Sequence, residues 1–169
     1  MRINRAFAVV PFLIGALALT GASASGGASA APKCLGKTAT IVRGDGDNQI
    51  TGTNGNDVIV AGGGADSIDA KGGKDRICGG AGNDQVAAGR GNDSVSGGSG
   101  KDQMVGQEGD DTLKGGGGND AMVGDEGDGD DSIFADDGLG GEAVDGGAGT
   151  DDTCQADATD NVSNCENAF

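Results

Sequence analysis

Residues 79–105 decide the fold, and in blocks of nine they read GGAGNDQVA, AGRGNDSVS and GGSGKDQMV. Each block has glycine at its fourth position, aspartate at its sixth, and an aliphatic residue or methionine at its eighth. The same phase extends outward without a gap over residues 43–123, in nine units. Two units of eleven residues and two further nonapeptides continue it to residue 163, for thirteen units in all. Repetition at a fixed short period is the signature of a solenoid.

Each unit divides into a loop and a strand. Glycine at positions one, two and four permits positive φ, so the first six residues can wind into a tight loop with inward-facing carbonyl groups. The last three residues form a short strand whose middle side chain points inward. That eighth position is aliphatic or methionine in twelve of thirteen units, with Thr153 as the exception. Because one apolar side chain cannot form a core alone, we expect neighbouring units to stack.

The sixth-position side chains are the candidate metal ligands. Eleven of the thirteen are aspartate. A carboxylate at the exit of a loop of carbonyl groups gives the oxygen-rich environment that Ca²⁺ prefers, and the repeat lacks the sulfur and imidazole ligands that favour zinc or copper. Glu142 falls where an eleven-residue unit interrupts the register, and it is not among the predicted ligands. The predicted ligands are Asn48, Asp57, Asp66, Asp75, Asp84, Asp93, Asp102, Asp111, Asp120, Asp131, Asp151 and Asp160.

This pattern resembles the RTX, or haemolysin-type, calcium-binding nonapeptide G-G-x-G-x-D-x-U-x, where U is a large apolar residue. The units at 79–87 and 97–105 match it at every position. The resemblance implies an all-β fold, a right-handed parallel β-roll (β-solenoid) with two units per turn. It further implies calcium ions between each loop and the loop one turn later, with at most 11 such sites over thirteen units. The implied function is calcium binding coupled to folding, with no enzymatic activity.

Some units depart from the family pattern at the second glycine, where Thr53, Lys71, Gln107 and Asp125 stand instead. Lys71 would place an ammonium group near a cation site, so we expect weaker binding there. The units at 79–123 are expected to hold the best sites. Replacement of Asp102 should therefore cost more calcium affinity than replacement of Asp75.

Composition excludes several other functions. The chain has 169 residues, of which 37 are Gly and 4 are Phe, with no Trp or Tyr, so a conventional core is not expected. It carries 27 acidic against 11 basic residues and a formal charge of −16, which disfavours nucleic-acid binding. Without histidine, the usual general base is missing. We expect calcium as the only small ligand, no small-molecule substrate and a monomeric chain.

Residues 1–30 have the features of a secretory signal peptide. Arg2 and Arg5 precede an apolar run over residues 6–19, and the segment ends in the small residues 28–30. No later segment approaches the roughly 20 apolar residues of a membrane-spanning helix. Loss of the two arginines would leave 9 basic against 27 acidic residues, a formal charge of −18. The expected location is secreted and extracellular.

Four cysteines in an exported chain predict two disulfides, for which three connectivities exist. The short separation of Cys154 and Cys165 favours that pair and leaves Cys34 with Cys78. Free or metal-binding thiols are disfavoured because no C-x-x-C spacing occurs. The expected organisation is an N-terminal cap at 31–42, a calcium-binding roll at 43–163 and the end of a C-terminal cap at 164–169.

A second function stays open: an extracellular adhesin, or a matrix or surface structural protein that uses the calcium-rigidified roll as a scaffold. Val105 and Val123, two units apart, could form a small apolar strip on one face. Ice binding would require a single residue type along one row, and the ninth positions show none.

Overall fold

The computed structural model describes residues 30–168 except 125, 126, 128 and 136. The chain divides into two units, Met1–Ala30 and Ala31–Phe169, and residues 1–29 of the predicted signal peptide lie outside the described residues. The described residues of the second unit form seventeen β-strands and no helix. A membrane-crossing helix is accordingly not found in this part of the chain.

Fifteen of these strands build two parallel sheets, and the other two form a hairpin. The seven-stranded sheet consists of β4 (Gln49–Thr51), β6 (Ser67–Asp69), β8 (Gln85–Arg90), β10 (Gln103–Glu108), β12 (Ala121–Val123), β14 (Ala143–Asp145) and β16 (Asn161–Ser163). The eight-stranded sheet consists of β3 (Ile41–Val42), β5 (Val58–Gly63), β7 (Arg76–Ala81), β9 (Ser94–Ser99), β11 (Thr112–Gly117), β13 (Ser132–Ala135), β15 (Thr153–Ala156) and β17 (Asn167–Ala168). The antiparallel hairpin is β1 (Lys33–Cys34) and β2 (Lys37–Thr38).

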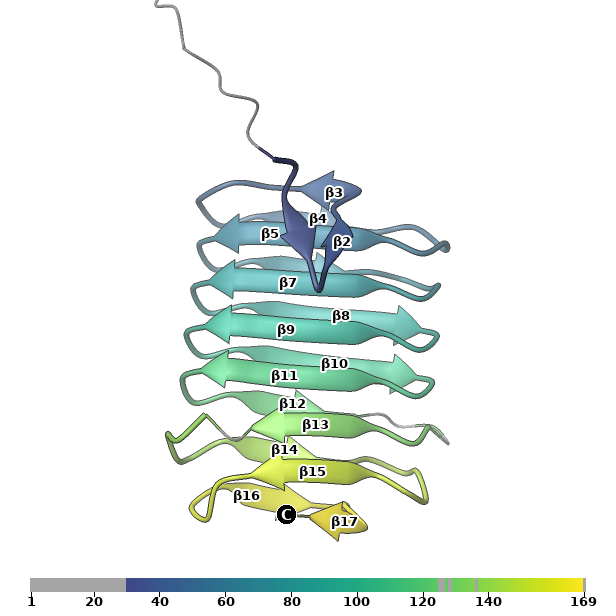
Figure 1. Cartoon of the computed structure of the whole chain (residues 1–169), viewed down its shortest axis with the longest axis vertical. Helices are drawn as coiled ribbons and strands as arrows, with labels where there is room; N and C mark the ends of the chain where they lie inside the picture. The colour runs from purple at the N-terminus through teal and green to yellow at the C-terminus, as the bar shows by residue number, and fades with distance from the viewer. Residues whose placement is uncertain (1–29, 125–126, 128, 136, 169) are drawn as a thin grey trace, which may run out of the picture. The chain divides into compact units, whose positions relative to one another are not determined.

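Successive strands alternate between the two sheets, so each turn of the chain contains two nonapeptides (Figure 1). The register shows this directly, because Ile59 pairs with Ile77 and Val86 pairs with Met104, eighteen residues apart. The result is a β-solenoid of about seven turns. The all-β parallel β-roll expected from the repeat is confirmed.

The core is a single file of eighth-position side chains from each sheet. Ile59, Ile77 and Leu113 are fully buried from one side, and Met104 and Met122 meet them from the other. Because each turn contributes only two such side chains, the apolar core is thin and cannot stabilise an isolated turn.

The glycines at the second and fourth loop positions are explained by the close approach of adjacent turns. Gly109 has φ +122°, and a Cβ there would lie 2.6 Å from the carbonyl oxygen of Gly91 in the adjacent turn. Two non-glycine residues nevertheless adopt positive φ at the second position, Lys71 and Gln107, each at +80°. The loops of adjacent turns therefore stack backbone against backbone.

The N-terminal elements cover one end and part of one face. Strand β3 begins the eight-stranded sheet, with Ile41 paired to Ile59 as the sequence spacing suggested. The β1–β2 hairpin lies over the outer face of that sheet, and β1 contacts β5 and β7 (Figure 1). The Cys34–Cys78 disulfide joins the hairpin to β7.

The last turn closes on itself through the Cys154–Cys165 disulfide, so both predicted pairings are confirmed. The predicted core position Thr153 is wrong. Ile133 pairs with Cys154, which is fully buried, whereas Thr153 is only half-buried. The apolar Cys154, and not the polar Thr153, fills the core position of β15. The unit after β14 is therefore one residue longer than a nonapeptide.

Candidate calcium-binding columns

The sixth-position aspartates point into the roll and form a hydrogen-bonded ladder. One carboxylate oxygen, Oδ1, accepts a hydrogen bond from the backbone N–H of the sixth-position residue one turn earlier. The N–H of Asp75 donates to Asp93 at 2.7 Å, and the N–H of Asp84 donates to Asp102 at 2.9 Å. Each carboxylate is thereby fixed in orientation by the preceding loop.

These residues form two columns, one for each set of loops. The first column contains Asn48, Asp66, Asp84, Asp102, Asp120, Glu142 and Asp160. The second contains Asp57, Asp75, Asp93, Asp111, Asp131, Asp152 and Glu166. All but Asn48, Asp160 and Glu166 have buried side chains.

Eleven of the twelve predicted ligands thus lie in the columns. Asp151 does not, because it is exposed and its neighbour Asp152 occupies the position instead. Sequence reasoning also missed Glu142 and Glu166. A signal for Asp152 was present, since Asp152-Thr153-Cys154 itself satisfies the aspartate–any–apolar pattern of the other units.

The second carboxylate oxygen is the feature that points to a cation. In the described part of the chain, this buried Oδ2 has no hydrogen-bond partner in Asp66, Asp75, Asp84, Asp93, Asp102 and Asp120. A Cβ built on Gly79 would overlap both the Asp84 Oδ2 and the carbonyl oxygen of Gly97. Carboxylate and carbonyl oxygens from successive turns therefore converge on the same space.

Burial makes these carboxylates hard to ionise in the absence of a cation. Burial raises the pKa of Asp93 and of Asp102 to about 6, partly offset by their backbone hydrogen bonds and reinforced by neighbouring aspartates. The same causes raise the pKa of Asp75 and Asp84. Burial, with Asp160 close by, raises the pKa of Glu142 to about 7. The folded columns favour either protons or a positive counter-ion.

Each column has one end residue that differs from the repeat. At the N-terminal end of the first column, Asn48 uses its neutral amide, and Nδ2 donates to the carbonyl of Gly44 at 3.2 Å and to Asp66 Oδ1 at 2.9 Å. At the C-terminal end of the second column, the longer Glu166 accepts the N–H of Asp152 at 2.9 Å. These two ends are therefore closed within the chain itself.

The donor set fits calcium. Within the described ranges, no group of three or more His, Cys, Asp or Glu side chains comes together to hold a metal ion. A cation between two turns would therefore take carboxylate oxygens from two stacked residues and its other ligands from loop carbonyls. Hard divalent cations, and calcium above all, accept such mixed oxygen ligands.

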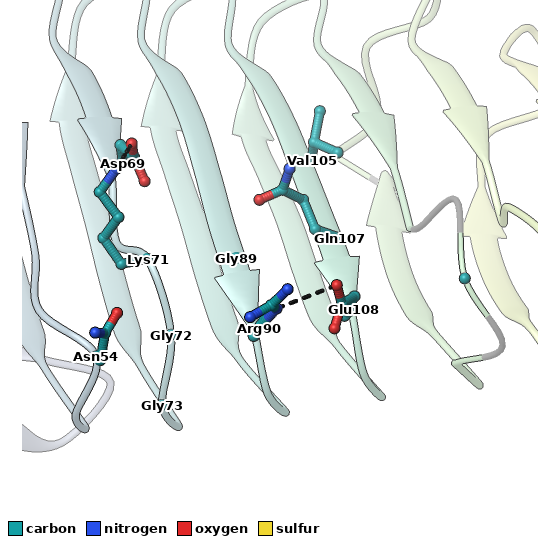
Figure 2. A pocket seen from close by; sticks show the side chains of 11 residues that line it. Asn54, Asp69, Lys71, Gly72, Gly73, Gly89, Arg90, Val105, Gln107 and Glu108 are labelled. Atoms are coloured by element: carbon teal, nitrogen blue, oxygen red, sulfur yellow. Dashed lines mark hydrogen bonds and ion pairs between the residues drawn. The ribbon is translucent and has the colours of Figure 1, made fainter.

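A shallow depression of about 1100 Å³ lies on the outer surface, away from the columns (Figure 2). Lys71 Nζ pairs there with Asp69 at 2.6 Å, and Arg90 Nε pairs with Glu108 at 3.2 Å. Lys71 thus directs its ammonium group to the surface and not to Asp75. The departure from glycine at position 71 leaves the column beside it unchanged.

A family model for the RTX calcium-binding nonapeptide repeat matches the chain in four overlapping copies, at residues 43–77, 63–95, 78–113 and 96–129. The matches span residues 43–129, more than half of the 169-residue chain. The protein is a β-solenoid of stacked acidic loops, and it belongs to the RTX calcium-binding nonapeptide repeat family. RTX repeats bind calcium and are in general structural rather than catalytic. Comparisons with curated proteins and with solved structures gave no match.

Proposed function

We propose that this protein is a secreted, monomeric, non-enzymatic calcium-binding protein that folds when calcium occupies the space between successive loops. The observation that carries the proposal is the row of buried Oδ2 atoms without hydrogen-bond partners in Asp66, Asp75, Asp84, Asp93, Asp102 and Asp120. A buried, unpaired carboxylate oxygen is costly unless a cation compensates it.

The column residues would hold the ions, and the ions would supply positive charge between carboxylates of successive turns. Seven residues in each column leave six intervals per column, twelve in all, one more than the limit of 11 from the sequence, because Glu166 extends the second column beyond the thirteen units. Asn48 and Asp160, at the two ends of one column, would contribute to single sites only. Asp152 takes the place predicted for Asp151.

Coupling to folding follows from charge and from the thin core. A chain of formal charge −18 after loss of residues 1–30 repels itself when compact, and the columns concentrate that charge. Bound ions would cancel this repulsion, so the free energy of binding becomes free energy of folding. Extracellular calcium modules bind at roughly 10⁻⁴ to 10⁻³ M, and magnesium should substitute poorly because it requires octahedral geometry.

Secretion is supported by two independent features. The first is the signal-peptide pattern of residues 1–30, and the second is the pair of disulfides, which persist in oxidising compartments. Low calcium inside the cell would keep the chain unfolded until export.

A calcium titration of the purified chain tests the proposal. Far-UV circular dichroism should show little strand signal in excess chelator and a cooperative gain in millimolar calcium, and elemental analysis should count the bound ions. Oxidised and reduced chains are compared, because the disulfides could order the ends without calcium. Equal strand signal with and without calcium in both forms would refute the coupling of binding to folding.

A scaffold for adhesion is the second candidate, and one observation favours it. Val105 and Val123 are direct neighbours on the outer faces of β10 and β12, as the apolar-strip hypothesis requires. A Val105→Thr, Val123→Thr variant that folds with calcium but loses cell or matrix attachment would support this function.

A further inference from the structure

Glu142 interrupts the ladder of its column. The rungs before and after it are intact: the N–H of Asp102 donates to Asp120 at 2.8 Å, and the N–H of Glu142 donates to Asp160 at 3.2 Å. Between them, the described structure contains no hydrogen bond from the N–H of Asp120 to Glu142. In consequence, neither carboxylate oxygen of Glu142 accepts a hydrogen bond from the preceding turn; both are buried beside the carboxyl group of Asp160, whereas the regular aspartates leave one oxygen without a donor.

The strand register explains the interruption. Ala121 pairs with Ala143 and Met122 pairs with Val144, so Glu142 stands opposite Asp120 despite the two extra residues of its unit. The additional methylene of glutamate extends the side chain by about 1.5 Å, one carbon–carbon bond. The carboxylate of Glu142 therefore does not cap the N–H of Asp120, and it lies beside the carboxyl group of Asp160 in the next turn with both oxygens buried.

The surroundings of this carboxylate are acidic. Glu142 is 1% exposed, and the charged groups that act on it are Asp160 and Asp137. Neither ion pair of the described structure involves Glu142, since they join Lys71 to Asp69 and Arg90 to Glu108. Asp160 is itself held by backbone donors, with Oδ1 accepting from Gly141 at 3.0 Å and Oδ2 accepting from Asp157 at 2.7 Å.

We infer that Glu142 and Asp160 form a calcium site of a second kind, in which Glu142 ligates the ion through both carboxylate oxygens. Calcium accepts bidentate glutamate readily, and its charge would compensate two neighbouring carboxylates at once. The site would tie the eleven-residue unit to the last turn of the roll. The inference rests on the proposed calcium binding, and it adds to the ligand set a residue that the repeat pattern leaves out.

Ion counting tests this site. The full chain, its Glu142→Gln variant and a Glu108→Gln control are dialysed against millimolar calcium, and bound calcium is measured by elemental analysis. Glu108 is a suitable control because it is an exposed glutamate in a surface ion pair. We expect Glu142→Gln to bind one ion fewer than the wild type, and Glu108→Gln to bind the same number.

Two outcomes separate the possible failures. If the wild type binds no calcium, the proposed function fails. If the wild type binds calcium and Glu142→Gln binds equally many ions with equal affinity, only the Glu142 site is wrong, and a proton rather than an ion compensates the two carboxylates. Should Glu142→Gln fail to fold, Glu142→Asp decides. An aspartate at position 142 can accept the Asp120 N–H and then has only one oxygen left for the ion. Calorimetry should therefore show one calcium ion bound more weakly than in the wild type. Unchanged affinity for every ion would overturn the inference.

Discussion

The close stacking of the loops predicts a large penalty for a single methyl group at Gly109. In a Gly109→Ala variant, φ of +122° is a strained conformation for an L-residue, which costs about 1–2 kcal/mol. The new Cβ would lie 2.6 Å from the carbonyl oxygen of Gly91 and 2.8 Å from its carbonyl carbon. Relief of this overlap must come from backbone atoms of the adjacent turn, and such overpacking costs about 1–3 kcal/mol. The reduced flexibility of the unfolded chain offsets about 0.4–1 kcal/mol of this cost, so we expect a net destabilisation of about 1–4.5 kcal/mol.

Gly117→Ala is the matched control, since a Cβ there would meet nothing within 4 Å and φ is not positive. Urea unfolding in millimolar calcium, followed by circular dichroism, gives the free energy of unfolding of each variant. The control should differ from the wild type by less than about 1 kcal/mol. If Gly109→Ala is no less stable than Gly117→Ala, the loops are not packed backbone to backbone and the explanation of the repeat glycines fails.

Three further predictions concern the columns and the disulfides. Because Lys71 pairs with Asp69 on the surface, we expect Asp75→Ala and Asp102→Ala to reduce the calcium affinity measured by calorimetry by similar factors. A much larger loss for Asp102→Ala would instead support the expectation from sequence that the site at Asp75 is weaker. The raised pKa values of Asp93 and Asp102, about 6, mean that the calcium-free fold gains stability from protonation below pH 4 and loses it as the pH rises through 6. Strand signal in chelator should therefore be greater at pH 4 than at pH 7.5, and the opposite trend would contradict the burial of these carboxylates. Removal of the Cys34–Cys78 disulfide, which spans 44 residues, should lower the free energy of unfolding by about 4 kcal/mol, and removal of Cys154–Cys165, which spans 11, by about 3 kcal/mol. Urea unfolding in calcium of variants with both cysteines of one pair replaced by Ala measures the two losses, and a larger loss for Cys154–Cys165 would contradict the prediction.

Sequence periodicity was sufficient for the regular part of the roll. A period of nine with one apolar residue per unit predicts which residues face inward, and the family resemblance supplied two units per turn, hence the pairing of Ile59 with Ile77. The disulfide pairing also followed from sequence, because only one pair of cysteines is close along the chain.

Counting failed where loop length changes. The unit after β14 has one extra residue, so a count of nine placed Thr153 in the core and Asp151 in the column, one residue too early for each. Burial of Cys154 decides the register there, and its apolar character was the available signal. The position of the β1–β2 hairpin on a sheet face depends on tertiary contacts of β1 with β5 and β7, which no local pattern encodes.

The spacing of the two columns sets the density of negative charge that folding brings together. Parallel strands repeat about every 4.8 Å, so two columns place one carboxylate per roughly 2.4 Å of axis. Double-stranded DNA, with one charge per about 1.7 Å, condenses a cloud of counter-ions at a comparable density. Monovalent cations would gather around the acidic, calcium-free chain and have to be released as calcium binds and the columns form. The apparent calcium affinity of the whole roll should then fall steeply with salt concentration, as it does for ligands of nucleic acids, and the ionic strength of the medium would set the calcium concentration at which the protein folds.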